Sequence, residues 1–564
     1  MASKIRERRY DAGLYQALTA AGNDALLSRL FAARQIGAIH EAQHDLGQLL
    51  HFSELKNIQA AARRLAEAVI RHERIMVMAD YDADGATACA LAVRGLRAMG
   101  AAVDYIVPNR FANGYGISPP LVDAARAAGA DVLLTVDNGI AAHEAVAYAH
   151  ALGMEVVVTD HHLPGDVLPD CLIVNPNQPD CAFPCKSLAG VGVMFYVLSA
   201  LRSELRAMDY FHDGRPAPNL AQWLDLVALG TVADVVRLDH NNRVLVAQGL
   251  ARIRRGKMSV GIRALFTVAA RDFRRARAFD LGFFIGPRIN AAGRLDDMDL
   301  GIRCLLCDDE TQAAELAAEL DTLNRERRSI EQGMIREALE LPQVELSARQ
   351  RTISVFGEDW HQGVIGIVAG RLREQFYRPT LAFARGDDGQ LRGSGRSVEQ
   401  LHLRDALDLT AKRFPHLIVK FGGHAMAAGL TLRADAFEGF QAAFEEVVAG
   451  LIDENDLIRE YRTDGSLDAA ELTLDTARKL AGQVWGQGFV EPSFCDTFHV
   501  LTQKTVGTQH TKLELGKDRH TFEAMIFRST EPLPATIRAV YRPVVNLWRD
   551  QEELQLFIDY WEAA

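Results

Sequence analysis

Three aspartates at alternate positions, Asp80, Asp82 and Asp84, are the residues of this sequence best suited to do chemistry. In extended backbone, alternate side chains point the same way, so these carboxylates can converge on one spot. Carboxylates that close together repel one another unless cations lie between them. The simpler alternative is a solvated acidic turn that caps the following helix, because aspartate is common before a helix. The three residues by themselves leave both interpretations open.

Further residues with metal-binding side chains follow apolar runs later in the chain. The first aspartates follow the run 75–78, and the runs 132–136 and 156–159 end in Asp137, Asp160, His161 and His162. Apolar runs that alternate with helical patterns indicate a parallel, doubly wound sheet. Ligands of such sheets bind at the carboxyl ends of the strands. Another acid, Asp234, comes just after a helical pattern. The pattern therefore favours a metal centre at one edge of a sheet.

The donor atoms are carboxylate oxygens and imidazole nitrogens, with no thiolate. This set favours Mn²⁺ or Mg²⁺, and manganese tolerates the histidine better. There are more acids than one ion needs, so we predict two ions about 3.5–4 Å apart that share a bridging carboxylate. Such a pair activates water for in-line attack on phosphorus and neutralises the charge on the phosphoryl oxygens.

The composition indicates a soluble globular protein. With 564 residues and 48% hydrophobic content, the chain can form roughly three or four domains. Its first ten residues are charged and lack the apolar core of a secretory signal, and no run has transmembrane length. Seven scattered cysteines fit a reducing compartment and argue against structural zinc, so we expect a cytoplasmic protein.

The charge distribution is uneven. The net charge of −12 argues against nonspecific nucleic-acid binding. However, nine basic residues lie between Arg252 and Arg277, with a single acid, Asp272, among them. This basic strip is either an ordinary solvated face or a surface that meets a phosphodiester substrate.

The motifs resemble those of the DHH phosphoesterase superfamily. They are Asp80-Tyr81-Asp82-Ala83-Asp84-Gly85, Asp137-Asn138-Gly139, Asp160-His161-His162 and Gly230-Thr231-Val232-Ala233-Asp234. The resemblance spans most of the chain, with the motifs in the right order. Within the superfamily, the chain is similar to the bacterial exonucleases that degrade single-stranded DNA from the 5′ end.

The resemblance implies two sets of metal ligands. One ion would be held by Asp80 or Asp82 together with Asp137. The implied ligands of the other ion are Asp84, Asp137, His161 and Asp234. Asp137 would bridge the two ions.

The catalytic residues implied by the resemblance overlap with these ligands. They are Asp82, Asp84, Asp137, His161, His162 and Asp234. His162 would lie near the scissile phosphate. Asp160 would not bind an ion itself but would orient one of the imidazoles.

Two arginines in a further family motif, Pro287 to Arg294, are predicted to contact substrate phosphates. A planar guanidinium can bind two phosphate oxygens, which suits Arg288 and Arg294 to this role. The alternative is that an arginine here pairs with a surface acid such as Asp296.

Five other residues complete the predicted substrate site, namely Arg110, Tyr115, Ser394, Arg396 and His424. Ser394, Arg396 and His424 could jointly hold phosphate, and Arg110, Ser394 and Arg396 are expected to grip a terminal 5′ phosphate. Tyr115 is expected to stack on a base or to block a duplex.

The predicted fold class is multidomain α/β. A doubly wound parallel-sheet DHH domain is followed by a long connecting helix, a smaller α/β domain of the DHHA1 type and a C-terminal β-barrel similar to an OB-fold. The predicted boundaries are 1–70 for an N-terminal helical segment that packs on the DHH domain, 71–307 for that domain, 308–345 for the helix, 346–455 for the DHHA1 domain and 460–564 for the barrel.

The predicted function is two-metal hydrolysis of single-stranded DNA in the 5′ to 3′ direction, which releases mononucleotides in DNA repair and recombination. We expect a monomer that binds a single strand with a 5′ end and no membrane, with a single-strand-binding protein and a helicase as candidate partners. A small-molecule phosphatase of the same superfamily is one alternative, but it needs neither the barrel nor the basic strip. A non-catalytic DNA-binding scaffold that has lost its metals is another alternative. Such a scaffold should have substitutions among the acids of the motifs, but all six are present, namely Asp80, Asp82, Asp84, Asp137, Asp160 and Asp234.

Overall fold

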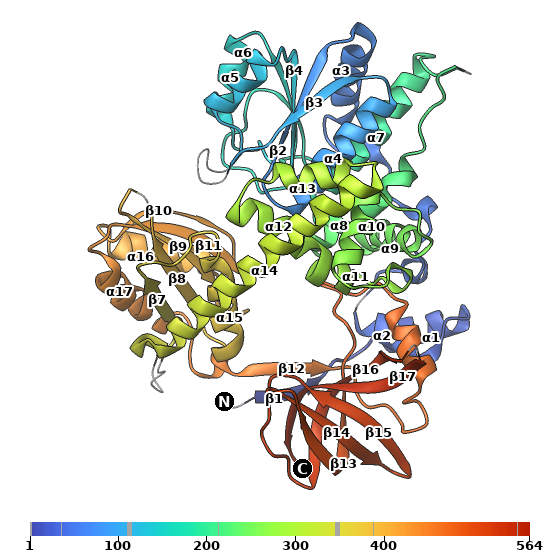
Figure 1. The fold of residues 1–564 in the computed structure, drawn as a ribbon, viewed down its shortest axis with the longest axis vertical. Helices are drawn as coiled ribbons and strands as arrows, with labels where there is room; N and C mark the ends of the chain where they lie inside the picture. The colour runs from blue at the N-terminus through green and yellow to red at the C-terminus, as the bar shows by residue number, and fades with distance from the viewer. Residues whose placement is uncertain are drawn as a thin grey trace. The chain divides into compact units, whose positions relative to one another are not determined.

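The computed structural model describes residues 3–34, 36–109, 116–212, 214–344, 350–386, 388–549 and 551–564. The chain divides into two compact units (Figure 1). The larger unit holds residues 7–323 and 462–564, and the smaller holds residues 1–6 and 324–461. One helix, α14 (Glu310–Glu340), contributes residues to both units.

A five-stranded parallel sheet forms the centre of the larger unit, as the alternating pattern predicts. Its order is β3-β2-β4-β5-β6, and every neighbouring pair is parallel. The strands are β2 (Arg74–Ala79), β3 (Ala102–Ile106), β4 (Val132–Val136), β5 (Glu155–Thr159) and β6 (Leu172–Val174). The short edge strand β6 was not expected from the sequence.

Helices cover both faces of this sheet, which confirms the doubly wound arrangement (Figure 1). Because successive strand residues point to opposite faces, Ile75 and Val77 join one core and Met76 and Met78 join another. The first core includes α3 (Ile58–Arg71), α4 (Ala83–Ala98) and α7 (Gly190–Ala207). The second includes α5 (Pro119–Ala127) and α6 (His143–Ala151).

A helical layer follows the sheet in the chain and packs around α4. Its members are α8 (Leu224–Ala233), α9 (His240–Arg254), α10 (Val260–Val268), α11 (Ala278–Asp280), the π-helical turn η6 (Leu281–Ile285), α12 (Gly286–Leu295) and α13 (Asp299–Leu306). Helices α8, α12 and α13 all contact α4. This layer therefore lies against the helix that begins at the acidic motif.

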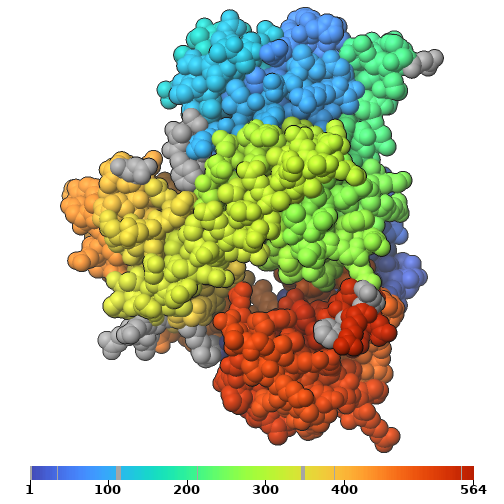
Figure 2. Space-filling view, viewed as in Figure 1, coloured from blue at the N-terminus to red at the C-terminus, as the bar shows by residue number. Residues whose placement is uncertain are grey.

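The C-terminal strands close into a five-stranded barrel, as predicted, and form one compact red body in the space-filling view (Figure 2). The order is β13-β14-β15-β17-β16, with one parallel pair, β15 and β17. The strands are β13 (Phe494–Val506), β14 (His510–Lys517), β15 (His520–Ile526), β16 (Thr536–Trp548) and β17 (Gln551–Ala563). The helix α18 (Leu474–Ala481) precedes them.

The N-terminal residues pack against the start of the barrel region within the larger unit. Helices α1 (Ala12–Ala20) and α2 (Ala25–Ala33) lead to Arg34, whose guanidinium pairs with the buried carboxylate of Asp464 at 2.9 Å. Arg8 binds the same carboxylate at 3.0 Å. The N-terminal segment is helical except for β1 (Ser3–Glu7), which pairs with β12 (Arg459–Thr463).

The smaller unit contains a mixed sheet in the order β10-β11-β9-β8-β7. Its strands are β7 (Ile353–Gly357), β8 (Thr380–Arg385), β9 (Leu391–Arg396), β10 (Ile418–Gly423) and β11 (Ala427–Leu432). The helices are α15 (Ile365–Phe376), α16 (Leu403–Arg413) and α17 (Phe437–Ala449). Among the described residues of the whole chain, no helix has the length and apolar character needed to cross a membrane.

Candidate metal centre

The acidic motif lies in the turn between β2 and α4, at the carboxyl edge of the sheet. Asp82 is the N-cap of α4, and its Oδ1 accepts hydrogen bonds from the amides of Asp84 and Gly85 at 2.9 and 3.0 Å. A side chain at Gly85 would lie 2.6 Å from the carbonyl oxygen of Asp80, so the turn requires glycine. The capping role considered for this motif is therefore real for Asp82, while Asp80 and Asp84 are buried beside it.

Asp84 connects this turn to the start of a distant helix. Its two carboxylate oxygens accept hydrogen bonds from the amides of Gly190 and Val191, at 2.6 and 2.9 Å, at the N-terminus of α7. Burial, followed by the negative charge of Asp82, raises the pKa of Asp84 to about 7. Each oxygen keeps a second lone pair, so the carboxylate can both hold α7 and serve as a metal ligand.

Asp137 follows β4 in a left-handed conformation, with φ of 63°. This conformation is uncommon outside glycine and is concentrated at functional sites. The neighbouring Asn138 donates from its side-chain amide to the carbonyls of Met78 and Val136, both at 3.0 Å. The amide thereby fixes the ends of β2 and β4 relative to each other, and with them Asp80 and Asp137.

The electrostatic environment of Asp137 is unfavourable for an uncompensated carboxylate. Burial raises its pKa well above the usual range, and the charges of Asp84, Asp82, Asp80 and Asp234 raise it further. Burial and three of the same acids also raise the pKa of Asp234, the residue that ends α8. Bound cations would relieve this repulsion.

The two histidines after β5 have opposite protonation preferences. Burial and the charge of His162 lower the pKa of His161 to about 4, so His161 is a neutral imidazole, the form that binds metals. Burial also lowers the pKa of His162, but a 2.7 Å hydrogen bond from its Nδ1 to Asp160 and the charge of that acid raise it to about 9. Asp160 is thus held beside His162 and also accepts the amide of Ile140 at 2.9 Å.

The geometry brings together the five aspartates and the one histidine expected as ligands, together with His162. Three groups have ligand atoms within 4.8 Å of one another, namely Asp80, Asp82 and Asp137; Asp84, His161 and Asp234; and Asp137, His161 and His162. The Oδ1 of Asp137 and the Nε2 of His161 are buried and 3.1 Å apart, yet neither makes a hydrogen bond. Buried polar atoms are rarely left in this state. A shared cation would satisfy both atoms, so these residues fit a metal centre.

Helix α12 carries the arginine motif and packs directly on the acidic turn. The Oδ1 of Asn290 accepts the amide of Ala83 at 2.8 Å, and Gly293 is so close to the carbonyl of Tyr81 that no side chain fits there. Sequence patterns predict no role for Asn290 or Gly293, although both lie inside the motif from Pro287 to Arg294. These two residues hold the acidic turn in position.

The two arginines of that motif differ in environment. Arg288 is buried, its guanidinium binds Asp321 at 2.8 Å, and its Nη1 donates to the carbonyl of Phe284 at 2.7 Å. Phosphate contact by Arg288 stays a prediction that would require this pair to open. Arg294 is half-buried in the last turn of α12, next to Gly293.

Three of the other predicted substrate residues lie in the smaller unit, and two lie outside the described residues. The latter are Arg110 and Tyr115. Ser394 and Arg396 are on one side of β9, with Nη1 of Arg396 3.3 Å from Oγ of Ser394. A side chain at Gly366, near the start of α15, would be 2.8 Å from that Oγ. A helix N-terminus, a hydroxyl and a guanidinium together make a candidate anion site, and His424 is exposed in the neighbouring β10–β11 turn.

The basic strip is largely engaged in contacts within the protein. Arg271 pairs with Asp280 at 2.6 Å, and Arg275 pairs with Glu552 at 2.9 Å. Arg254 donates to the carbonyl of Ala276 at 2.8 Å. Much of the strip therefore joins helices to one another and to the barrel, and a direct contact with phosphate stays a prediction for its remaining cations.

Family models match three successive parts of the chain. They are the DHH family N-terminal domain over residues 74–231, the DHHA1 domain over 349–450 and the RecJ OB domain over 463–560. These matches agree with the parallel sheet, the mixed sheet and the barrel.

Curated relatives and solved structures are similar over nearly the whole chain. The single-stranded-DNA-specific exonuclease RecJ of Salmonella typhimurium is 51% identical, and that of Escherichia coli is 47% identical, each over 95% of both chains. The crystal structure of RecJ from Thermus thermophilus in complex with Mn²⁺ aligns with a TM-score of 0.83 and 30% identity, over 100% of this chain and 80% of the other. The Mg²⁺ complex aligns with a TM-score of 0.77 over 100% and 79%.

Proposed function

This chain belongs to the RecJ family of single-stranded-DNA-specific exonucleases, and we propose that it removes mononucleotides from the 5′ end of a DNA strand. It is a metal-dependent hydrolase of phosphodiester bonds, and its cofactor is Mn²⁺ or Mg²⁺. The observation that carries the proposal is the group of buried acids and imidazoles at the carboxyl edge of the parallel sheet.

The ligand groups found in the structure support a division between two ions. Asp80, Asp82 and Asp137 would hold one ion, and Asp84, His161 and Asp234 would hold the other. The buried Oδ1 of Asp137 near the Nε2 of His161 supports a bridging role for this carboxylate. When bound, two such ions neutralise phosphate charge and lower the pKa of the attacking water.

His162 supplies the proton chemistry in this proposal. Since Asp160 raises its pKa to about 9, His162 is protonated at neutral pH. A protonated imidazole beside the scissile phosphate can donate a hydrogen bond to a phosphoryl oxygen and a proton to the departing 3′ oxygen. Asp160 keeps the imidazole oriented for this step.

The anion site of the smaller unit is the proposed holder of the 5′ end. Arg396 and Ser394 of β9 lie beside the start of α15, and this arrangement is suited to bind a terminal phosphate. Departure of a 3′ oxygen leaves a new 5′ phosphate on the shortened strand. Each turnover therefore produces the end that this site takes in the next one.

The cellular setting is a further part of the proposal. All seven cysteines are free thiols, which agrees with a reducing compartment such as the cytoplasm. We propose a monomer that acts in DNA repair and recombination on strands opened by a helicase and covered by a single-strand-binding protein.

Strands labelled at one end test the proposed activity. A 5′-labelled single strand should release its label as a mononucleotide from the first turnover with Mn²⁺ or Mg²⁺, whereas a 3′ label should stay on shortening strands. Chelator should abolish both signals, and blunt duplex DNA should be resistant. Early release of the 3′ label, or full activity in chelator, would contradict the proposal.

A further inference from the structure

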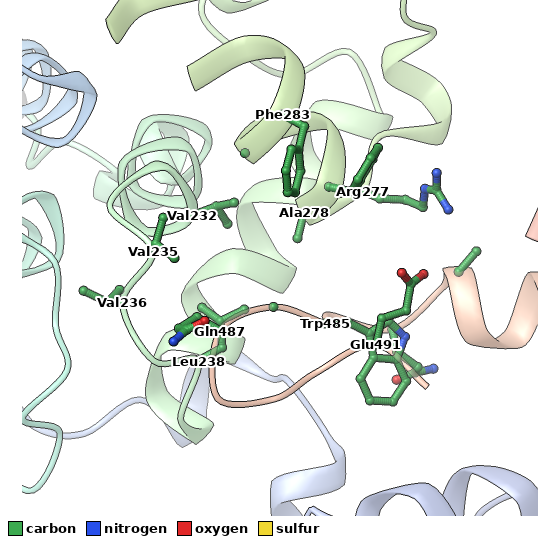
Figure 3. A pocket seen from close by; sticks show the side chains of 15 residues that line it. Val232, Val235, Val236, Leu238, Arg277, Ala278, Phe283, Trp485, Gln487 and Glu491 are labelled. Carbon is green, nitrogen blue, oxygen red and sulfur yellow. The ribbon is translucent and has the colours of Figure 1, made fainter. Parts of the chain in front are cut away.

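An apolar pocket of about 380 Å³ opens in the larger unit, between the end of α8, the segment containing α11 and η6, and residues 481–491 ahead of the barrel (Figure 3). Its volume is at the small end of the range for ligand sites. Phe283 and Arg277 lie on one side, and Trp485 and Gln487 on the other (Figure 3). We propose that this pocket holds a nucleobase of the single DNA strand, an inference that rests on the proposed function.

One residue of the pocket wall is the sequence neighbour of a predicted metal ligand. Val235 lines the pocket and directly follows Asp234, a predicted ligand, so their Cα atoms are about 3.8 Å apart. Val235 has a φ of 61° and is 62% exposed. That conformation is an outlier for a β-branched residue, and such strain is maintained where the surroundings impose it. The chain thus turns sharply between Asp234, a predicted ligand, and Val235 in the pocket wall.

Two phenylalanines present their rings at the pocket without being buried. Phe279 and Phe283 stack with their ring centroids 4.6 Å apart and an interplanar angle of 29°. They are 44% and 64% exposed. Phe283 belongs to the π-helical turn η6, and π-helical turns are frequent at functional sites. A stacked, exposed aromatic pair is the surface on which single-stranded nucleic acids place their bases.

The opposite wall is rigid and carries polar groups suited to the edge of a base. The Nε1 of Trp485 donates to the carbonyl of Leu480 at 2.7 Å, and the indole stacks on Phe489 with centroids 5.3 Å apart. The ring is therefore fixed in place. Gln483 and Gln487 also line the pocket, and an amide side chain can donate to and accept from a base.

Two charged side chains line the pocket, Arg277 and Glu491. Arg542 pairs with Glu491 at 2.8 Å and compensates its charge, so Arg277 is the cation available to a phosphate at the pocket. Arg277 lines the pocket and lies 5.8 Å from the ring of Phe279. A strand that places a base on the exposed Phe279 and Phe283 rings would have a phosphate near Arg277, where the attraction weakens with salt.

Binding measurements on the full chain test the pocket. In the inactive Asp137→Ala background with Mg²⁺, Phe279→Ala combined with Phe283→Ala should weaken binding of a long single strand about tenfold or more, the range for losing an aromatic stack. Phe283→Tyr should retain wild-type affinity because it keeps the ring. Tyr10→Ala is the matched control, since Tyr10 is also 44% exposed and contacts another aromatic ring but does not line the pocket.

A series of strands with one abasic position tells a base pocket from other contacts. In protein with both phenylalanines, affinity should be lower only for strands whose abasic nucleotide stands at one particular position from the 5′ end. In the double phenylalanine variant, all strands of the series should bind with the same affinity. In active protein, that variant should raise KM on long strands. A flat abasic series, unchanged affinity of the double variant, or an unchanged KM on long strands would overturn the inference. Those results would leave the exonuclease activity intact, whereas label release in chelator would remove the proposed function itself.

Discussion

Gly190→Ala should disable the metal centre through a single methyl group. Gly190 is the first residue of α7, its amide binds Asp84, and a Cβ there would lie 2.5 Å from Cβ and 2.7 Å from Oδ1 of Asp137. Ordinary contacts begin at 3.4 Å. The methyl group therefore overlaps the predicted bridging carboxylate, which is also held in a left-handed backbone conformation.

The overlap sets the expected size of the effect. To remove the overlap between the new methyl group and Asp137, either Asp137 or the start of α7 must move by about 0.9 Å. A misplacement of about 1 Å in a catalytic group costs on the order of 10²-fold in rate. We expect kcat to fall at least about 10²-fold.

Gly192→Ala is the matched control on the same helix. Its Cβ would meet Cδ2 of Leu188 at 3.0 Å, and this flexible side-chain end can move. Single-turnover cleavage of a short 5′-phosphorylated strand should be near normal in this control and slow in Gly190→Ala, and isothermal titration with Mn²⁺ should show weakened binding only in the latter. Wild-type kcat in a folded Gly190→Ala protein would refute the placement of Asp137 at the ions.

Three further predictions concern individual side chains. Asp137→Ala should lower kcat at least ~10³-fold while binding of single-stranded DNA survives in anisotropy measurements; near-normal turnover would reject the two-ion assignment. The protein should prefer 5′-phosphorylated over 5′-hydroxyl strands by roughly 1.5–3 kcal/mol, or about one to two decades in affinity. Arg396→Ala should remove most of this preference in competition assays. An unchanged preference would show that other residues bind the terminal phosphate. His162 has a pKa raised to about 9, so its proton is present below that pH and lost above it. Asp160→Asn should therefore move the alkaline fall of kcat to lower pH, toward the ordinary value of 6.5; an alkaline limb that stays in place would show that His162 does not supply the proton.

Patterns local in the chain were sufficient to predict the sheet, the barrel and the residues at the strand ends that could bind a metal. Buried parallel strands are continuous apolar runs, and the runs before Asp80, Asp137 and Asp160 are strands β2, β4 and β5. Parallel strands end at one edge, so their terminal acids had to meet. The alternation of β-rich runs and turns after residue 490 likewise predicts a small barrel, because period and turn chemistry are short-range signals.

Only the tertiary structure shows how each of these groups is held. The bonds of Asp84 to α7 join residues more than a hundred positions apart, and Arg288 is buried against Asp321. The pocket combines Val235, Phe283 and Trp485 from three distant segments. Hydrophobic periodicity states which face of an element is buried, but it contains no information about which other element covers that face. The residue types that can bind a metal are thus a property of the sequence, whereas the partners that orient them, and the exposure of a stacked aromatic pair beside them, arise from packing between elements.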